Sequence, residues 1–264
     1  MINIPNKTTH PLNKNQVSSL NCKIKSAFRK ETIASLNEKR NQQQSHQQHR
    51  SAPQLTRQSA QSKLVLPRPQ QLQSQPVPKL SHPLKKGQKT ALGLYEKGIS
   101  KIKVCFGWNI LDTRCDMDAS AFLLGENGRV LDERWFVFYN QPLSPDRSVS
   151  FLKAENGSDR EQIYIDLKKL NPVVQKIVFV LTIDEAFSKN LNFGMIRDAY
   201  VRLINDTDNQ EIASFCLEEY YQNVTSMTMA ELYLHNDQWK LNPVGNGVHQ
   251  DLAGQCRIYG VEIG

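Results

Sequence analysis

Short apolar stretches, either alternating with polar positions or running uninterrupted, fill the chain from about residue 85 onward. Residues 162–167 (QIYIDL) alternate strictly between apolar and polar side chains, which is the pattern of a strand with one buried face. Residues 176–183 (KIVFVLTI) are almost entirely apolar, as is typical of a central strand covered on both faces. Residues 101–108 (KIKVCFGW) and 119–124 (ASAFLL) predict two further strands. The pattern therefore predicts a body built from strands.

Three turn sequences are expected to join these and neighbouring strands into hairpins. Residues 125–129 (GENGR) carry an Asn-Gly dipeptide ahead of a further predicted strand, VLDERWFVFYN. Residues 200–217 form a second candidate hairpin around DTDNQ. Residues 231–241 form a third, which turns at Asn236-Asp237.

Strands of this length at this spacing predict an all-β fold for residues 84–264, a β-sandwich of two mainly antiparallel sheets. A short helix is expected near residues 184–191 (DEAFSKNL), and little other helix. The chain before this body contains tracts such as NQQQSHQQHR and RPQQLQSQPVPK, which are rich in Gln, Pro and Lys and poor in large apolar side chains. Such a segment cannot bury enough apolar surface to offset the entropy of ordering, so residues 1–83 are predicted to form a disordered basic arm.

Charge divides the chain at nearly the same place. Residues 1–90 carry 16 Lys and Arg against 2 acids, whereas the remainder carries 17 Lys and Arg against 24 acids, within a net charge of +7. A basic arm on an acidic body favours an acidic partner for the arm, such as nucleic acid or an anionic surface. Residues 23–40 space apolar side chains at roughly helical intervals. They predict a short helix, either transient in the tail or docked on such a partner.

Membrane proteins, secreted disulfide-stabilised proteins and zinc-stabilised proteins are not supported by the sequence. No apolar run reaches the length of a transmembrane segment, and the N-terminal residues lack the apolar stretch of a signal peptide. The five cysteines are scattered, with no C-x-x-C pair. No Ser/His/Asp or Cys/His pairing at an informative spacing indicates catalysis. We therefore expect a cytoplasmic protein that is not an enzyme.

The candidate chemistry begins at residues 115–124 (CDMDASAFLL), where Asp116 and Asp118 stand at the start of an apolar strand. Carboxylates two residues apart on an extended chain project to the same side. Without a counter-charge they would repel each other, and a divalent cation between them would reverse the sign of that interaction. The pair is therefore either part of a cation site, for which hard oxygen ligands suit calcium, or the solvated polar end of a loop.

A series of segments occurs in a distinctive order: LKKGQKTAL, KIKVCFGWN, DMDASAFLL, WFVFYNQPLSPD, IYIDLKKLNPVVQKIVFVLTI, NFGMIRDAYVRLIN, ELYLHNDQWKLNPVGNG and YGVEI. Together they resemble the TerD domain, the tellurium-resistance and stress-response family, over roughly residues 84–264. The resemblance implies a β-sandwich in a small cytosolic protein that is not known as an enzyme. It also implies partners among other stress-response proteins and Ca2+ as a cofactor, bound through acidic loops.

In the family, the D-x-D-A-S-A segment contributes carboxylates to the calcium sites, and a long acidic, glycine-rich loop precedes the strand that matches IYIDL. That loop is shortened here to KAENGSDREQ, with basic Arg160 inside it, and Asn109 stands where the family usually has Asp. The implied oxygen ligands are six: Asp116, Asp118, Glu155, Asn156, Asp159 and Glu161. Fewer charged ligands imply lower affinity. The alternatives are one weakened calcium site or a metal-free loop.

Two smaller groups complete the candidates. Asp184 and Glu185 follow an apolar strand and are either additional acids of the site or a solvated strand end. The three tryptophans are expected to pack in the core: Trp108, Trp135 and Trp239. The resemblance therefore implies a non-enzymatic stress-response binding module, with either one weakened calcium site or a metal-free loop. The alternative is a metal-independent interaction protein whose basic arm binds an acidic partner or nucleic acid.

Overall fold

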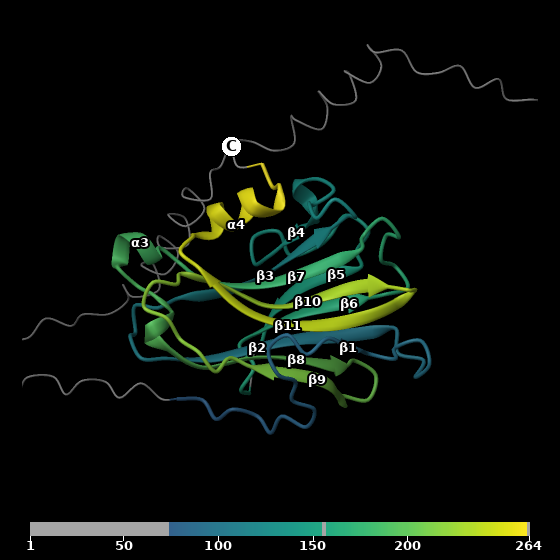
Figure 1. Ribbon diagram of the computed structural model, residues 1–264, viewed down its shortest axis with the longest axis horizontal. Helices are drawn as coiled ribbons and strands as arrows, with labels where there is room; N and C mark the ends of the chain where they lie inside the picture. Colours follow the sequence, from purple (N-terminus) through teal and green to yellow (C-terminus); the bar gives the residue numbers. More distant parts are fainter. Residues whose placement is uncertain (1–73, 155–156, 263–264) are drawn as a thin grey trace, which may run out of the picture. The chain divides into compact units, whose positions relative to one another are not determined.

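The computed structural model describes residues 74–154 and 157–262 (Figure 1). The predicted helix at 23–40 and most of the predicted arm lie outside the described residues. Strands account for most of the regular structure: β1 (Thr90–Ala91), β2 (Lys101–Ile110), β3 (Met117–Leu124), β4 (Phe136–Val137), β5 (Val149–Lys153), β6 (Glu161–Asp166), β7 (Lys176–Ile183), β8 (Ile196–Asn205), β9 (Glu211–Cys216), β10 (Ser226–His235) and β11 (Gln238–Val248). Short helical pieces lie between or after them: η1 (Glu133–Trp135), α3 (Ala186–Lys189), η2 (Phe193–Met195) and α4 (Leu252–Tyr259).

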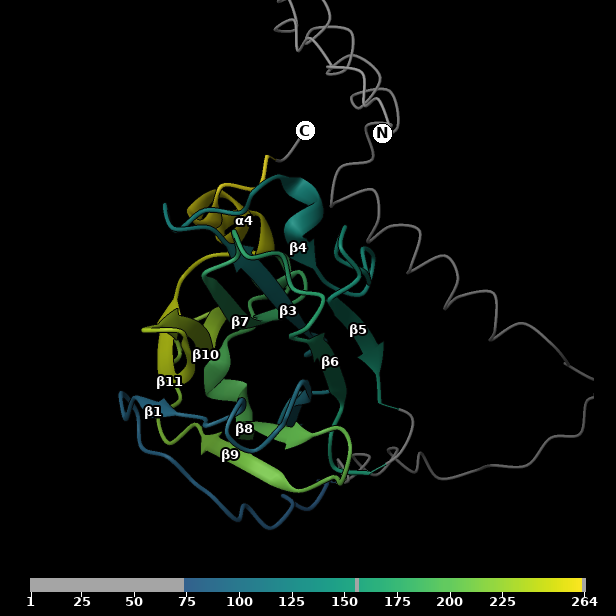
Figure 2. The same cartoon turned by 90° about the vertical axis from the view of Figure 1, so that its right-hand side faces the viewer.

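These strands form two sheets that pack face to face (Figures 1 and 2). One sheet has six strands in the order β1-β11-β10-β7-β3-β4, and the other has five in the order β5-β6-β2-β8-β9. Each ladder between these strands is antiparallel. The predicted all-β sandwich is confirmed.

Apolar side chains from both sheets fill the space between them. In β6, Glu161, Ile163 and Ile165 are buried and the intervening residues are half-buried, so the predicted alternation is present. Phe106 of β2 and Phe179 of β7 meet across the sandwich with their ring centroids 5.9 Å apart. Burial of such side chains is the dominant favourable contribution to folding.

Strand β7 is buried on both faces because the six-stranded sheet is also covered on its outer side. Helix α4 lies over this side near β3 and β4 (Figure 1). Tyr259 of α4 contacts Phe122 of β3 with ring centroids 4.5 Å apart. The Tyr259 carbonyl also accepts a hydrogen bond from the Val130 amide at 2.9 Å. The near-continuous apolar pattern of β7 thus reflects its central position under a helix.

The helix expected near residues 184–191 is present as α3, and helix is otherwise minor in the described residues, as expected; the eight-residue helix α4 was not predicted. Helix α4 has clear boundary signals. Asp251 accepts a hydrogen bond from the Gly254 amide at its start, and Gly260 ends it with φ of 80°. These two residues set the ends of an eight-residue helix that the strand-dominated pattern around it had obscured.

The three predicted turns behave differently. Asn236 and Asp237 have φ of 50° and 57° and join β10 directly to β11, so this hairpin is confirmed. The turn between β8 and β9 is also confirmed. After the GENGR turn, however, only Leu124 and Val130 pair before the chain leaves the ladder. It forms η1, capped by Asp132, and returns as the two-residue strand β4. The continuous strand predicted there is wrong because this local cap interrupts it.

The three tryptophans lie in the core, as predicted. Trp108, Trp135 and Trp239 are each no more than 6% exposed. They occupy β2, η1 and β11, so each packs a different part of the sandwich. None of the three forms an exposed platform on which a ligand could stack.

Candidate metal site

The buried Glu161 carboxylate joins the two sheets at one end of the sandwich. Glu161 begins β6 and is 4% exposed, and its Oε2 accepts a hydrogen bond from the Ala119 amide of β3 at 2.5 Å. Strand β4 pairs with β3 at Ala121 and Phe122. Ala119 lies outside the β3–β4 ladder, and its amide donates to the Glu161 side chain rather than to a strand.

Two further carboxylates act on Glu161 as like charges. Burial, followed by the charge of Asp118 and more weakly that of Asp116, raises the pKa of Glu161 to about 8. The Ala119 hydrogen bond and the Lys153 ammonium group oppose this shift in pKa. The structure therefore brings together three of the predicted ligands, Asp116, Asp118 and Glu161, which we call the acidic end.

The acidic end borders the loop that follows β7. The Asp184 amide donates a hydrogen bond to the Asp116 carbonyl at 2.8 Å, so this loop runs beside the start of β3. Glu185 forms an ion pair with Lys189 of α3 at 2.6 Å. The hydrogen bond to Glu185, together with the charges of Glu185, Asp184 and Asp116, raises the pKa of Lys189. Asp184 and Glu185 are therefore neighbours of the predicted ligands, and Lys189 interacts with acids of both groups.

Asp159 lies apart from the acidic end. Its carboxylate accepts hydrogen bonds from the Tyr200 hydroxyl at 2.9 Å and from the Arg202 guanidinium at 2.7 and 3.0 Å. Tyr200 and Arg202 flank Val201 in β8, and Val201 pairs with Phe106 of the inner core. Because side chains alternate along a strand, these partners of Asp159 lie on the outer face of the sheet. The structure does not bring the Asp159 carboxylate to the acidic end.

The remaining predicted ligands belong to the shortened loop. Glu155 and Asn156 lie outside the described residues. Arg160, also in this loop, donates from Nε to the Trp108 carbonyl at 2.6 Å, and its guanidinium carbon lies 5.7 Å from the Trp108 ring centroid. Burial lowers the pKa of Arg160. The basic residue of the loop is thus held against β2.

The carboxylates of the acidic end suit calcium in chemical type, because calcium takes hard oxygen ligands in irregular loops. Within residues 74–154 and 157–262, however, no group of three or more His, Cys, Asp or Glu side chains has the arrangement of a metal cluster. The carboxylates of the acidic end would therefore provide only part of a calcium ion's coordination. Backbone carbonyls, water or further side chains would have to supply the rest.

Comparison with known proteins settles the family. Residues 80–259 match the family model described as the TerD domain. This chain belongs to the TerD family. It is 36% identical over 189 residues to the tellurium resistance protein TerD of Serratia marcescens, covering 69% of this chain and 98% of that protein. It is 34% identical over 192 residues to general stress protein 16U of Bacillus subtilis, again covering 69% and 98%.

A solved structure supports the fold of this TerD domain. The crystal structure of SAV2460, a protein of unknown function, superimposes with a TM-score of 0.50 at 17% sequence identity. The superposition covers 62% of this chain and 99% of that one. At this level of identity the likeness concerns the fold alone.

Sequence reasoning missed two lysines that flank the acidic end of the TerD domain. Lys189 follows Glu185 at the i, i+4 spacing of a helical ion pair, and this spacing was a usable signal. Lys153 pairs with Glu161 across the β5–β6 ladder. That neighbour relationship depends on strand register, which the local pattern around Lys153 does not reveal.

The described cysteines of the TerD domain are free thiols: Cys105, Cys115, Cys216 and Cys256. Burial raises the pKa of all four, to about 11 for Cys115 and about 12 for Cys256. A raised pKa keeps a thiol protonated and a poor nucleophile.

In the described part of the chain, no helix is long and apolar enough to cross a membrane.

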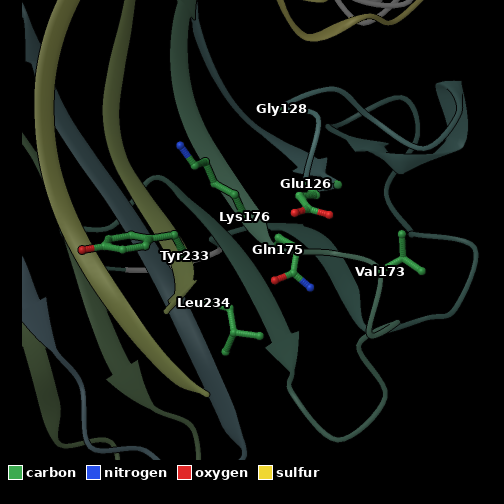
Figure 3. Close-up of a pocket in the computed structure, with 8 residues that line it drawn as sticks. Glu126, Gly128, Val173, Gln175, Lys176, Tyr233 and Leu234 are labelled. Carbon is green, nitrogen blue, oxygen red and sulfur yellow. The ribbon is translucent and has the colours of Figure 1, made fainter. Parts of the chain in front are cut away.

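A pocket of about 670 Å³ lies at the other end of the β3–β7 ladder, where Leu124 pairs with Lys176 (Figure 3). Lys176 and Tyr233 line one side and Glu126 the other. The side chains do not converge on one point, and the Lys176 ammonium group is already paired with Glu231 at 3.4 Å. The pocket therefore offers no organised set of groups for chemistry.

Proposed function

We propose that this chain is a non-enzymatic stress-response binding module whose acidic end binds one calcium ion. The proposal extends to this chain the roles that its relatives' names give, tellurium resistance and general stress. Other stress-response proteins are its proposed partners. A cytoplasmic location is part of the proposal and is supported by the free cysteines of the described residues, since disulfides are rare in that compartment.

The observation that carries the proposal is the Glu161 carboxylate, buried beside Asp118 and Asp116. A buried carboxylate close to like charges is disfavoured in its ionised form. A divalent cation changes the sign of that interaction, because each carboxylate then faces a positive charge. Since Glu161 and Asp118 come from different sheets, binding would stabilise the contact between the sheets at this end.

Calorimetric titration of calcium into the metal-free, full-length chain tests the proposal, with the midpoint of thermal unfolding followed in parallel. We expect saturable heat near one equivalent and a higher midpoint. At a calcium concentration 100 times Kd, the stabilisation would be about 2.7 kcal/mol. The absence of both heat and shift up to millimolar calcium, the weak end of protein sites, would contradict calcium binding.

Matched variants separate a bound ion from general charge screening. The double variant Asp116→Asn with Asp118→Asn should lose the heat and the shift of the midpoint. Glu126→Gln removes an exposed carboxylate at the opposite end of β3 and should keep both. If the two variants respond to calcium equally, the acidic end is not the site.

A second candidate function rests on the division of charge. The basic residues 1–90 and the acidic remainder favour an interaction of the arm with an acidic partner or nucleic acid that needs no metal. Binding of the full-length chain to duplex DNA of arbitrary sequence should weaken linearly on a log–log plot against salt and be unchanged by chelator. Binding that ignores salt, or no binding at low salt, would exclude nucleic acid as the partner.

A further inference from the structure

Residues 75–84, which we call the strap, run along the outer side of the five-stranded sheet. Figures 1 and 2 show this segment, in blue, beyond β8 and β9 on the side away from the six-stranded sheet. The composition of the sequence assigned residues 75–83 to the arm, whereas the match to the TerD domain begins at residue 80. In the structure they are held by six hydrogen bonds to the sandwich, and every one of them uses the main chain of the strap.

Asn109 at the end of β2 holds the first residue of the strap. Its Oδ1 accepts from the Gln75 amide at 2.8 Å and its Nδ2 donates to the Gln75 carbonyl at 2.9 Å. The Nδ2 group also donates to Asp198 Oδ2 at 2.8 Å. Because a carboxylate only accepts, Asp198 fixes which end of the Asn109 amide faces each partner. Asn109 is 6% exposed, and its side-chain amide binds both the N–H and the C=O group of Gln75.

Strand β9 holds the other end of the strap. Glu211 Oε1 accepts from the amides of Ser81 and His82, both at 2.8 Å. Ser214 donates its amide to the His82 carbonyl at 2.9 Å and accepts from the Leu84 amide at 2.8 Å. The strap therefore extends the sheet by a short stretch beside β9.

The strap is built as an extended segment that makes little apolar contact. No residue of the strap is buried, and only Pro78, Leu80 and Leu84 are half-buried. Its prolines, Pro76, Pro78 and Pro83, avoid the positions whose amides donate. Proline also favours an extended conformation of the preceding residue, which lowers the entropy lost on binding. A segment with so few buried apolar contacts opens at low free-energy cost.

One polar atom of this surface is left without a hydrogen-bond partner. Glu211 Oε2 is buried and is the unsatisfied side-chain atom of the described residues. A buried acceptor without a donor is unfavourable. Of the two Glu211 carboxylate oxygens, only Oε1 therefore accepts from the strap.

We propose that Asn109, Glu211 and Ser214 form a binding site for an extended peptide segment, and that the strap is its built-in ligand. The site recognises the main chain, so its ligand is an extended segment with N–H groups at the positions of Gln75, Ser81, His82 and Leu84. The site runs from Asn109 on the outer face of the five-stranded sheet to Ser214 at the β9 edge, and it does not depend on calcium. A second segment of this kind competes with the strap for the site.

The test disables the strap without changing the site. Ser81→Pro with Leu84→Pro, in the full-length chain, removes two donor amides of the strap and no side chain of the site. A fluorescent peptide of residues 74–86 should bind this double variant saturably. It should bind the wild type at least tenfold more weakly, because the tethered strap competes at a high effective concentration. The same peptide carrying both prolines should not bind.

A second set of variants changes the site. Asn109→Asp, placed on the double variant, replaces a donor by an acceptor that repels both the peptide carbonyl and Asp198, so peptide binding should weaken at least tenfold. Asn127→Asp is the matched control, because Asn127 uses only its Oδ1, toward the Arg129 amide, in an exposed turn. It should leave peptide binding unchanged.

Three outcomes would overturn the proposal. These are equal peptide binding by the wild type and the strap variant, no binding by a strap variant that still unfolds cooperatively, and no effect of Asn109→Asp. If the double variant does not fold, Leu84→Pro alone removes the donor to Ser214, and the same comparisons apply.

Discussion

The Glu161 side chain of β6 accepts a hydrogen bond from the Ala119 amide of β3, so this one side chain links the two sheets of the sandwich. The contact lies at the end where Asp116 and Asp118 also gather. A protonated carboxyl group accepts this hydrogen bond without the electrostatic penalty of a buried charge, whereas a carboxylate incurs that penalty. The stability of this end should therefore depend on pH and on cations.

The first prediction concerns pH. Burial and Asp118 raise the pKa of Glu161 to about 8 from 4.5. Because the folded state holds this proton more tightly than the unfolded state, the contribution to stability is full below about pH 4.5 and is lost as pH rises through 8. Without metal, the thermal midpoint should be higher at pH 6 than at pH 8.5. Glu161→Gln should flatten this difference, and an equal slope in both proteins would contradict it.

The second prediction concerns Asp146, which organises the loop before β5. Although burial alone would raise its pKa, hydrogen bonds from Ser148, Ser144 and the Asn171 amide lower it. Asp146→Ala leaves several of these donors without an acceptor and should reduce the free energy of unfolding by about 2–3 kcal/mol. Urea denaturation measures this loss. Asp208→Ala, which removes one exposed contact to the Gln210 amide, should change stability by less than about 1 kcal/mol.

The third prediction separates Asp159 from the acidic end. Arg202→Ala should destabilise the protein by about 3 kcal/mol, because it leaves the mostly buried Asp159 carboxylate without its cation. Asp159→Asn with Arg202→Gln should recover part of this loss in a double-mutant cycle. Calcium titration of Asp159→Asn should match the wild type. A lost calcium response in this variant would return Asp159 to the ligand set.

The fourth prediction concerns the close approach of Tyr200 to Gly107. A Cβ atom at Gly107 would lie 2.3 Å from the Tyr200 ring and its hydroxyl oxygen. Gly107→Ala should therefore lower the free energy of unfolding by about 3 kcal/mol, the upper part of the range for overpacked sites. Gly128→Ala is a control for the loss of glycine itself, because no atom lies within 4 Å of its added Cβ. It has φ of 71° and should cost about 1 kcal/mol from backbone strain alone.

Local sequence patterns predicted the parts of the fold that depend on local physics. The alternation at Ile163 and Ile165 and the turn at Asn236 predicted a strand and a hairpin that the structure contains. Helix α4 was missed although Asp251 marks its start, because eight residues between strand-like segments give a weak periodic signal. The capping residues Asp251 and Gly260 mark this helix more clearly than its apolar periodicity does.

Some of the expected site residues lie near one another in the structure and others do not. The family resemblance indicated Asp116, Asp118 and Glu161, which the structure brings together. It also indicated Asp159, whose ion pair with Arg202 joins residues 43 positions apart. Such a pairing follows from strand order and from which face each side chain takes, and neither is encoded in the local spacing of acids.

The edges of the two sheets are short or covered, each in a different way. Strands β1 and β4 have two residues each. The outer side of β5 is lined by residues 142–144, and that of β9 by the end of the strap. A further β-strand needs a long run of unpaired backbone as a template, and these margins offer only short ones. These short or covered edges therefore oppose the growth of a sheet shared between copies, which is the first step toward fibrous aggregates.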